Sequence, residues 1–518
     1  MTVNKVDLRD TRRFGALFLD YLEGRDQLRE FYGNAPEIAN FRAQIEAKKF
    51  PAERRKILCQ ALEEQYTDLP LTDQVKNNLH LLAEANTYTI TTGHQLNLFT
   101  GPLYFIYKIV TVIRTCQELK AQYPSCHFVP VYWMATEDHD FEEINHFRFN
   151  GKKYQWETDQ SGAVGRFNLS DISDFVKTVP GAPEFFKTAY RQKDLAAAVR
   201  HYVNHLFGDY GLVVVDGDDH TLKKELSEVI RDDLFHHTAK SLVDDQSGKL
   251  NELGYKTQVF PREINFFYLQ DNVRERIEKE NGVFKVLNTD DEFQNTELEA
   301  LIEAEPERFS PNVILRPLYQ EMILPNLAYI GGPAEVAYWL QLKPVFDHYH
   351  EIFPVLMPRN FAMVIPDHLQ KKLEKTGLAI TDLFQEKHGL LARMAVENAD
   401  HKVRLNGQVQ EMVDLFERIR VQAENIDPTL TAHVAAQQAR TRHKLETIEK
   451  KFVRAEKRLQ ADRLRQAESV IDQLFPNEGL QERTDNFLDF YLTDPSFIDQ
   501  LITHFDPFDY RFHVLGNG

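Results

Sequence analysis

Polar side chains that could do chemistry follow an apolar, β-rich run in the segment TTGHQLNLFTGPLYFIYK, residues 91–108. Thr-Gly-Pro at 100–102 predicts the start of a helix, whose free N–H groups would favour an anion such as phosphate or carboxylate. The alternative is a loop whose polar groups only cap that helix. The candidate binding residues here are His94, Gln95, Asn97, Thr100, Gly101 and Lys108.

A second cluster, WMATEDHDFEEINH at residues 133–146, directly follows another apolar run. Carboxylates beside a histidine could bind Mg²⁺ or Zn²⁺, orient an amine, or act as a general base. Their spacing matches neither HExxH nor an EF-hand, and a solvated acidic turn is the structural alternative. We take Glu137, Asp138, His139 and Asp140 as candidate catalytic residues, and Trp133, Asn145 and His146 as candidate binding residues.

The third segment is NLAYIGGPAEVAYW, residues 326–339, where Gly-Gly-Pro separates a predicted strand from a predicted helix. Such a junction allows close approach of a ligand to the backbone. Glu335 lies in the first helical turn, where the helix dipole alone would stabilise a carboxylate, so its role could be structural. Gly331, Gly332, Glu335 and Tyr338 are the candidate binding residues.

Strands and helices alternate through the first part of the chain, which predicts an α/β fold with a doubly wound, mostly parallel sheet. Loops at the carboxyl ends of such strands converge on one crevice, so Gln95, His139 and Gly332 should lie together. Apolar residues repeat three or four positions apart in several stretches of residues 7–86, which predicts N-terminal helices. Further strands are expected at 127–135, 211–219, 312–318, 326–332 and 351–360.

Composition excludes several classes of protein. The 518 residues suggest about two to four domains. Asp and Glu outnumber Lys and Arg by 79 to 61, which argues against nucleic acid as a partner. We expect no membrane insertion and a cytoplasmic location, because no signal peptide or long apolar run is present. The cysteines form no metal or disulfide motif, and no GxGxxG, GxxxxGK[ST] or GxSxG occurs.

The predicted organisation has a core at 1–384, a helical coiled-coil domain at 385–505 and a C-terminal tail, 506–518, that docks on the core. Hairpin-like and turn-rich sequence predicts insertions at about 145–178 and 250–310. Apolar residues recur every three or four positions in the helical part, which indicates a long helical hairpin. The expected seam comprises Val409, Met412, Phe416, Ile419, Leu445, Ile448, Phe452, Ala455 and Leu459, and it resumes at Leu464, Ala467, Ile471 and Leu474.

Together the motifs TTGHQLNLFTGPLYFIYK, PVYWMATEDHDFEEINHF and YIGGPAEVAYWLQL resemble, in sequence and order, the bacterial family that adds cysteine to glucosaminyl-malate in bacillithiol biosynthesis. The resemblance covers essentially the whole chain. It implies a Rossmann-like core with two inserted connecting segments, and a C-terminal coiled coil that supports a homodimer. It also implies cysteine and glucosaminyl-malate as substrates.

Amide formation from a carboxylate and an ammonium group needs an activated carboxyl, so we expect ATP or another nucleotide, with or without Mg²⁺, and no tightly bound metal. A carboxylate or histidine would deprotonate the attacking amine. Two other functions stay open at this point. One is a metal-dependent amide or sugar hydrolase with Asp138, His139, Asp140 and His146 as ligands, and the other is a non-catalytic coiled-coil scaffold.

Overall fold

The computed structural model describes residues 2–397 and 403–516, and its centre is a five-stranded sheet with the order β13-β12-β2-β3-β6. Every neighbouring pair in this sheet is parallel, so the predicted doubly wound sheet is confirmed. The strands are β2 (Thr87–His94), β3 (His127–Met134), β6 (Val213–Asp216), β12 (Asn326–Gly331) and β13 (Val355–Pro358).

The chain enters this sheet in the middle, at β2, continues outward through β3 and β6, and then returns to the other side of β2 with β12 and β13. The strand order therefore reverses between β2 and β12. In doubly wound sheets a crevice opens at this switch point, beyond the carboxyl ends of the strands.

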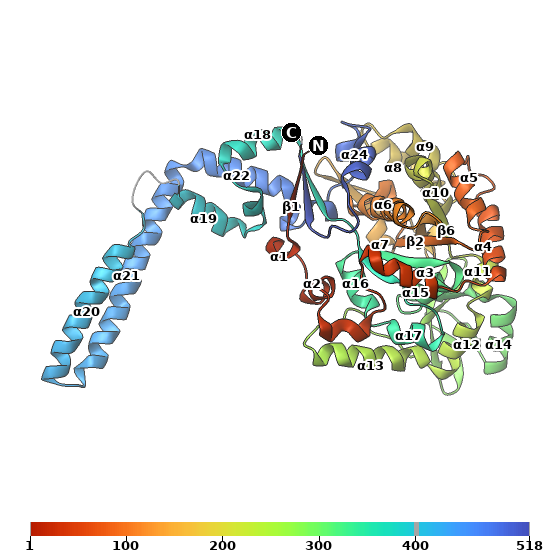
Figure 1. Cartoon of the computed structure of the whole chain (residues 1–518), viewed down its shortest axis with the longest axis horizontal. Coiled ribbons are helices and arrows are strands. Elements are labelled where there is room, and N and C mark those ends of the chain that lie inside the picture. The colour runs from red at the N-terminus through yellow and green to blue at the C-terminus, as the bar shows by residue number, and fades with distance from the viewer. Residues whose placement is uncertain (1, 398–402, 517–518) are drawn as a thin grey trace.

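Helices cover the sheet because its strands are apolar on both sides. Figure 1 shows them around the strands on the globular side of the molecule. The helix α6 (Tyr104–Gln122) packs against β2, β3 and β12, whereas α16 (Pro333–Trp339) packs against β12 and β13. The other helices around this core are α2 (Ala16–Leu22), α3 (Phe41–Ala47), α4 (Ala52–Gln65), α5 (Asp73–Leu81), α10 (Leu195–Phe207), α11 (His220–Lys224), α12 (Ser227–His236), α13 (Thr238–Glu252) and α17 (Lys343–His348).

Two segments interrupt the alternation of strands and helices near the expected positions. The first contains the hairpin of β4 (His146–Phe149) and β5 (Lys152–Gln155), followed by α8 (Ile172–Thr178) and α9 (Glu184–Ala189). The second forms a separate five-stranded antiparallel sheet around α14 (Asn295–Ala304). Its strands are β7 (Phe266–Gln270), β8 (Val273–Glu280), β9 (Val283–Val286), β10 (Glu292–Phe293) and β11 (Phe309–Pro311).

One predicted strand is wrong. Residues 312–318 form a turn that leads into the helix α15 (Arg316–Ile323). Asn312 stabilises this turn, because its side-chain oxygen accepts a hydrogen bond from the Ile314 N–H at 2.8 Å. Pro317 near the first helical position favours the helix start, since it needs no hydrogen-bond partner there.

The C-terminal part returns to the N-terminus. The strand β15 (Phe512–Gly516) pairs antiparallel with β1 (Thr2–Val6) and parallel with β14 (Ala362–Ile365). Beyond β14, α18 (Asp367–Thr376), α19 (Lys387–Glu397) and α22 (Ala461–Leu474) pack together, and α24 (Phe497–His504) packs on α6. The expected domain limits themselves stay a prediction.

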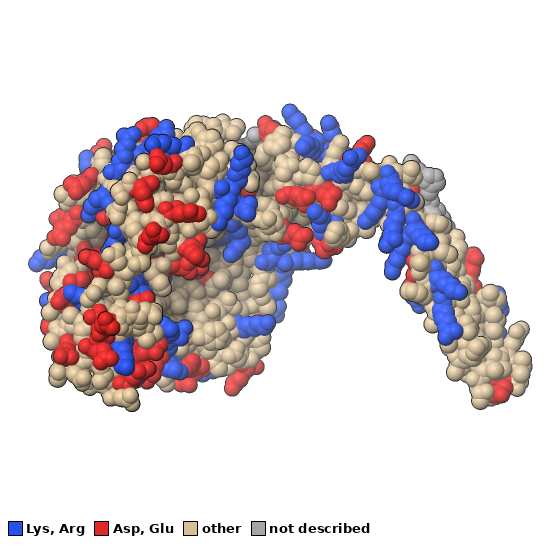
Figure 2. All heavy atoms as spheres, turned by 180° about the vertical axis from the view of Figure 1, so that it is seen from behind, with Lys and Arg blue, Asp and Glu red and all other residues tan. Residues whose placement is uncertain are grey.

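The helices α20 (Asn406–Ile426) and α21 (Leu430–Leu459) form an antiparallel pair, here called the arm, which projects from the rest of the molecule (Figure 1). The expected seam is wrong in parts of both helices. Ile448, Phe452 and Leu459 are 42, 44 and 72% exposed, and Ala455 of α21 and Ile419 of α20 are exposed as well, whereas Leu445 and Val453 are half-buried. Figure 2 shows many Lys and Arg side chains along the same region. Within the described residues, no helix is long and apolar enough to cross a membrane.

Candidate functional site

A cavity of about 850 Å³ opens at the switch point of the sheet, beyond the carboxyl ends of β2, β3 and β12. It brings together side chains from all three predicted segments. Of the candidate residues, those that line it are His94, Gln95, Lys108, Trp133, Glu137, Asp138, Gly332, Glu335 and Tyr338. Gln95 and Gly332 thus share one cavity, as expected. The expectation is wrong for His139, which lines a different cavity that has Arg274 in common with this one.

His94 lies in the wall of the cavity. Its Nε2 is 2.8 Å from the side-chain nitrogen of Asn97, an amide that can only donate. Burial, reinforced by the charges of Lys108 and Arg359, holds the pKa of His94 well below its usual value. His94 is therefore neutral with its Nε2 lone pair occupied, which leaves it no role as a proton acceptor on that atom.

The turn at Thr100 and Gly101 lies outside the cavity, so these residues and Asn97 are not placed to touch a ligand there. The Leu103 N–H, which we expected to be free, donates to the backbone oxygen of Asp485 at 2.8 Å. Gly101 has φ +60°, and a Cβ at this position would lie 2.6 Å from the Cβ of Asn97. The Thr-Gly-Pro sequence thus serves a tight turn that the C-terminal segment covers.

The Gly-Gly-Pro junction is likewise satisfied within the protein. The Gly332 N–H donates to Glu335 Oε2 at 2.7 Å, while Glu335 Oε1 accepts from Lys108 Nζ at 2.8 Å and from the Tyr329 hydroxyl at 2.7 Å. Burial raises the pKa of Glu335, but these partners outweigh burial and leave it below its usual value. Glu335 is therefore an ionised carboxylate that connects β12, α16 and α6, and Gly331 lies beside it.

The acidic segment after β3 presents an unusual pair of carboxylates. Gln95 Nε2 donates to Asp138 Oδ2 and to Glu143 Oε2, each at 2.8 Å. The other oxygen of Asp138 accepts from the backbone N–H of His139, also at 2.8 Å. Within the described residues, neither Asp138 nor Glu143 forms an ion pair with Lys or Arg. This pair, here called the acidic pair, can therefore accept a positively charged group such as an ammonium ion.

Glu137 and His139 have other partners. Glu137 forms a buried ion pair with Lys223, which also donates to the Phe309 backbone oxygen at 2.8 Å, so it ties β3 to the second inserted sheet. The Nδ1 of His139 is 2.5 Å from Arg274 Nη1. Because a guanidinium can only donate, Nδ1 accepts and the neutral ring carries its proton on Nε2. Burial and Arg274 also lower the pKa of His139, so Asp138 is the better-placed proton acceptor.

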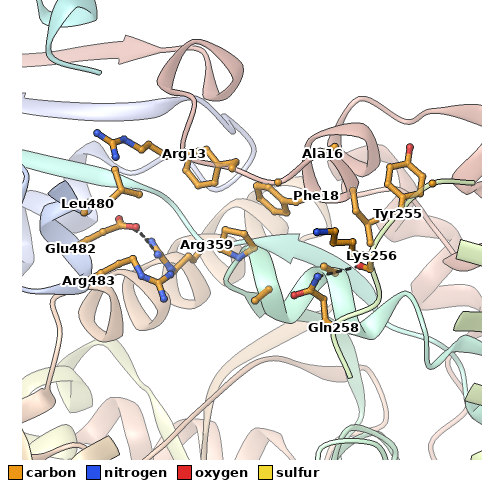
Figure 3. A pocket seen from close by; sticks show the side chains of 18 residues that line it. Arg13, Ala16, Phe18, Tyr255, Lys256, Gln258, Arg359, Leu480, Glu482 and Arg483 are labelled. Atoms are coloured by element: carbon orange, nitrogen blue, oxygen red, sulfur yellow. Dashed lines mark hydrogen bonds and ion pairs between the residues drawn. The ribbon is translucent and has the colours of Figure 1, made fainter. Parts of the chain in front are cut away.

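Arginines dominate the remaining wall, and sequence reasoning missed them. Arg359 pairs with Glu482 at 2.6 Å (Figure 3) and Lys108 pairs with Glu335, but the other cations of the wall form no ion pair with a described carboxylate. These unpaired cations are Arg262, Arg274, Arg316 and Arg483. Arg262 and Arg483 are exposed, but Arg274 is buried and Arg316 half-buried, and such a cation without a counter-charge is costly, so this wall favours an anionic ligand. Arg359 directly follows β13, a strand-end position from which the sequence could have revealed it.

The last candidates lie away from the cavity. Asp140, Asn145 and His146 do not line it, and His146 Nδ1 contacts the side-chain oxygen of Asn145 at 2.9 Å. In the part of the chain that the structure describes, no group of three or more His, Cys, Asp or Glu residues is placed to hold a metal ion. The ligand set of the hydrolase alternative is thus not assembled among Asp138, His139, Asp140 and His146.

Comparison with known proteins gives matches over the whole length. Residues 1–360 match the model of the bacillithiol biosynthesis BshC N-terminal Rossmann-like domain, and residues 362–516 match that of its C-terminal coiled-coil domain. Among curated relatives, a protein of Flavobacterium psychrophilum is 43% identical over 95% of both chains. One of Cytophaga hutchinsonii is 41% identical over 98% of this chain and 97% of its own. Both carry the name "Putative cysteine ligase BshC".

Proposed function

The chain belongs to the BshC family of bacillithiol biosynthesis, and on this premise we propose that it is a ligase joining the carboxyl group of cysteine to the amine of glucosaminyl-malate. The name of its relatives supports the ligase class, and the geometry of the cavity supports the choice of substrate.

The observation that carries this proposal is that the wall of the cavity holds both cations and carboxylates. Arginines without an ion-pair partner among the described residues, such as Arg316, line the cavity together with the acidic pair of Asp138 and Glu143, and Arg274 contacts His139 next to that pair. Glucosaminyl-malate has two carboxylates on its malate part and an ammonium group on its sugar. Its charges therefore complement both signs of charge in the wall, which a neutral sugar would not do.

The reaction also requires activation of the cysteine carboxyl by ATP or another nucleotide, which supplies an acyl-adenylate or acyl-phosphate. Arg483 and the ion pair of Arg359 with Glu482 lie at the edge of the cavity, where it borders a second cavity of about 640 Å³ (Figure 3). Guanidinium groups suit phosphate oxygens. In the second half of the reaction, the sugar amine forms the C–N bond, the phosphate-bearing group leaves, and Asp138 takes the amine proton.

Incubation of the purified protein with cysteine, glucosaminyl-malate and ATP tests this function. We expect a thiol product with the mass of the amide, together with AMP or ADP in equal amount. Omission of each reactant in turn provides the control. Binding of glucosaminyl-malate without any product would favour a non-catalytic role, whereas cleavage of an amide would favour a hydrolase.

We also propose a homodimer through the arm. Ile448, Phe452 and Leu459 repeat four and seven positions apart on α21, so they share one exposed face, here called the arm stripe. On α20, Leu415 and Ile419 are 46 and 37% exposed in the same way. Apolar side chains at this spacing are typical of helices that pack against a partner helix.

A charge placed in the arm stripe should separate the dimer. We expect the wild-type protein to have twice the mass of the chain in light scattering at micromolar concentration, and Phe452→Glu to be monomeric, because burying a carboxylate in an apolar contact is unfavourable. Thr447→Glu adds the same charge at an exposed position of α21 outside the stripe and should stay dimeric. A monomeric wild-type protein would contradict the proposal.

A further inference from the structure

The segment 258–265, here called the strap, passes along the mouth of the main cavity without regular secondary structure, between α13 and β7. Its first end is fixed by the buried side chain of Gln341. The Oε1 of Gln341 accepts from the N–H groups of Gln258 and Val259 at 2.8 and 3.2 Å, and its Nε2 donates to the Val259 oxygen at 2.8 Å.

The other end of the strap is fixed by Asn265, which is also buried. Its side-chain nitrogen donates to Asp233 Oδ1 at 2.9 Å and to the Arg262 backbone oxygen at 3.0 Å. Its Oδ1 accepts from the Arg262 N–H at 3.1 Å. Two buried amide side chains therefore hold the strap in place while leaving Phe260 and Pro261 between them.

The middle of the strap carries an exposed apolar ring and a cation without an ion-pair partner among the described residues. Phe260 is 78% exposed, the highest value for a large apolar side chain outside the arm within the described residues, yet it lines the cavity. Val313, which lines the same cavity, is also exposed, at 42%. Arg262 lines the cavity too and forms no ion pair with a described carboxylate. An apolar ring and an unpaired cation thus stand together at the mouth of an arginine-lined cavity.

We propose that Phe260 and Arg262 are substrate-binding residues, which the strap brings onto the bound substrate. The guanidinium of Arg262 pairs with a carboxylate of the ligand, and the ring of Phe260, together with Val313, covers the mouth and excludes water. This inference rests on the proposed function, because an activated cysteine carboxyl reacts with water as well as with an amine. A cover that excludes water directs the acyl group to the amine.

Hydrogen exchange of the full-length protein, with and without saturating glucosaminyl-malate, tests the closure. We expect the amide of Phe260 to exchange ~10-fold or more slowly with the ligand bound, because closure removes it from water. The amides of Gln258 and Val259, already bound to Gln341, and of Arg262, already bound to Asn265, should change much less. Ligand binding measured by calorimetry without protection of the strap would overturn this inference and leave the proposed function standing. Absence of binding would overturn both.

Two variants separate the roles of the side chains. Arg262→Gln should raise the Kd for glucosaminyl-malate ~10-fold, a loss appropriate to one partly exposed charge contact. Phe260→Ala should bind nearly as well but consume more nucleotide per amide formed, since water reaches the acyl group. Arg276→Gln, a surface arginine of β8 that pairs with Glu278, is the matched control and should change neither quantity. Unchanged Kd and unchanged nucleotide consumption in the two test variants would overturn the inference.

Discussion

Replacement of Asp138 by Asn should lower the rate of amide formation ~10²-fold or more, because the attacking amine then loses its proton acceptor. Asp138 lies in the cavity, shares Gln95 with Glu143 and has no Lys or Arg ion-pair partner among the described residues. Asn is nearly the same size and can still accept the N–H of His139. We therefore expect the melting temperature to change little, and single-turnover product formation to report the loss.

The neighbouring residues supply matched controls for Asp138. Asp140→Asn removes the same charge two positions away, outside the cavity, and should retain most of the activity. His139→Gln should have a smaller effect than Asp138→Asn, since the His139 ring already accepts from Arg274. A loss of activity in Asp140→Asn as large as that in Asp138→Asn would exclude Asp138 as the specific base. Unfolding of Asp138→Asn would instead indicate a structural role.

The sheet and the position of the cavity could be predicted from the sequence because their signals are local. Apolar runs followed by Gly and polar residues mark strand ends, and the carboxyl ends of parallel strands must share one edge. The segment 312–318 shows the limit of this reasoning. A short apolar run does not distinguish a strand from the approach to a buried helix, and here Asn312 and Pro317 decide for the helix.

The details of the site could not be predicted, because they depend on contacts between distant residues. The Thr-Gly-Pro helix start looks free in the sequence, but the segment containing Asp485 covers it. Glu335 occupies the Gly332 N–H that we expected to bind an anion. The positive charge instead comes from arginines such as Arg274 and Arg316, which no motif connects. In the arm, the same apolar repeat fits two neighbouring faces of α21, and spacing alone does not tell that Leu445 and Val453 are half-buried while Ile448 and Phe452 are exposed.

Replacement of Arg316 by Gln should raise the Kd for glucosaminyl-malate about 10²-fold, which calorimetry measures without need of the reaction. Arg316 begins α15 and lies over the rings of Trp133 and Tyr329 at 5.9 and 5.8 Å. Its guanidinium donates to the neutral side chain of Gln320 at 3.1 Å and to the hydroxyl of Tyr338. The guanidinium is thus held between aromatic rings and forms no ion pair with a described carboxylate, so a substrate carboxylate is its expected partner.

The substitution Arg316→Lys sharpens this prediction, because it retains the charge but loses the planar fork that holds a carboxylate with two hydrogen bonds. We expect its Kd to lie between those of the wild type and Arg316→Gln. Arg231→Gln removes a surface arginine that pairs with Glu303 and should bind as the wild type does. If Lys restores full affinity, a point charge suffices and the two-bond contact is excluded. If Gln binds as well as Arg, the substrate carboxylates lie elsewhere in the cavity, and the assignment of the arginine wall to the malate part fails.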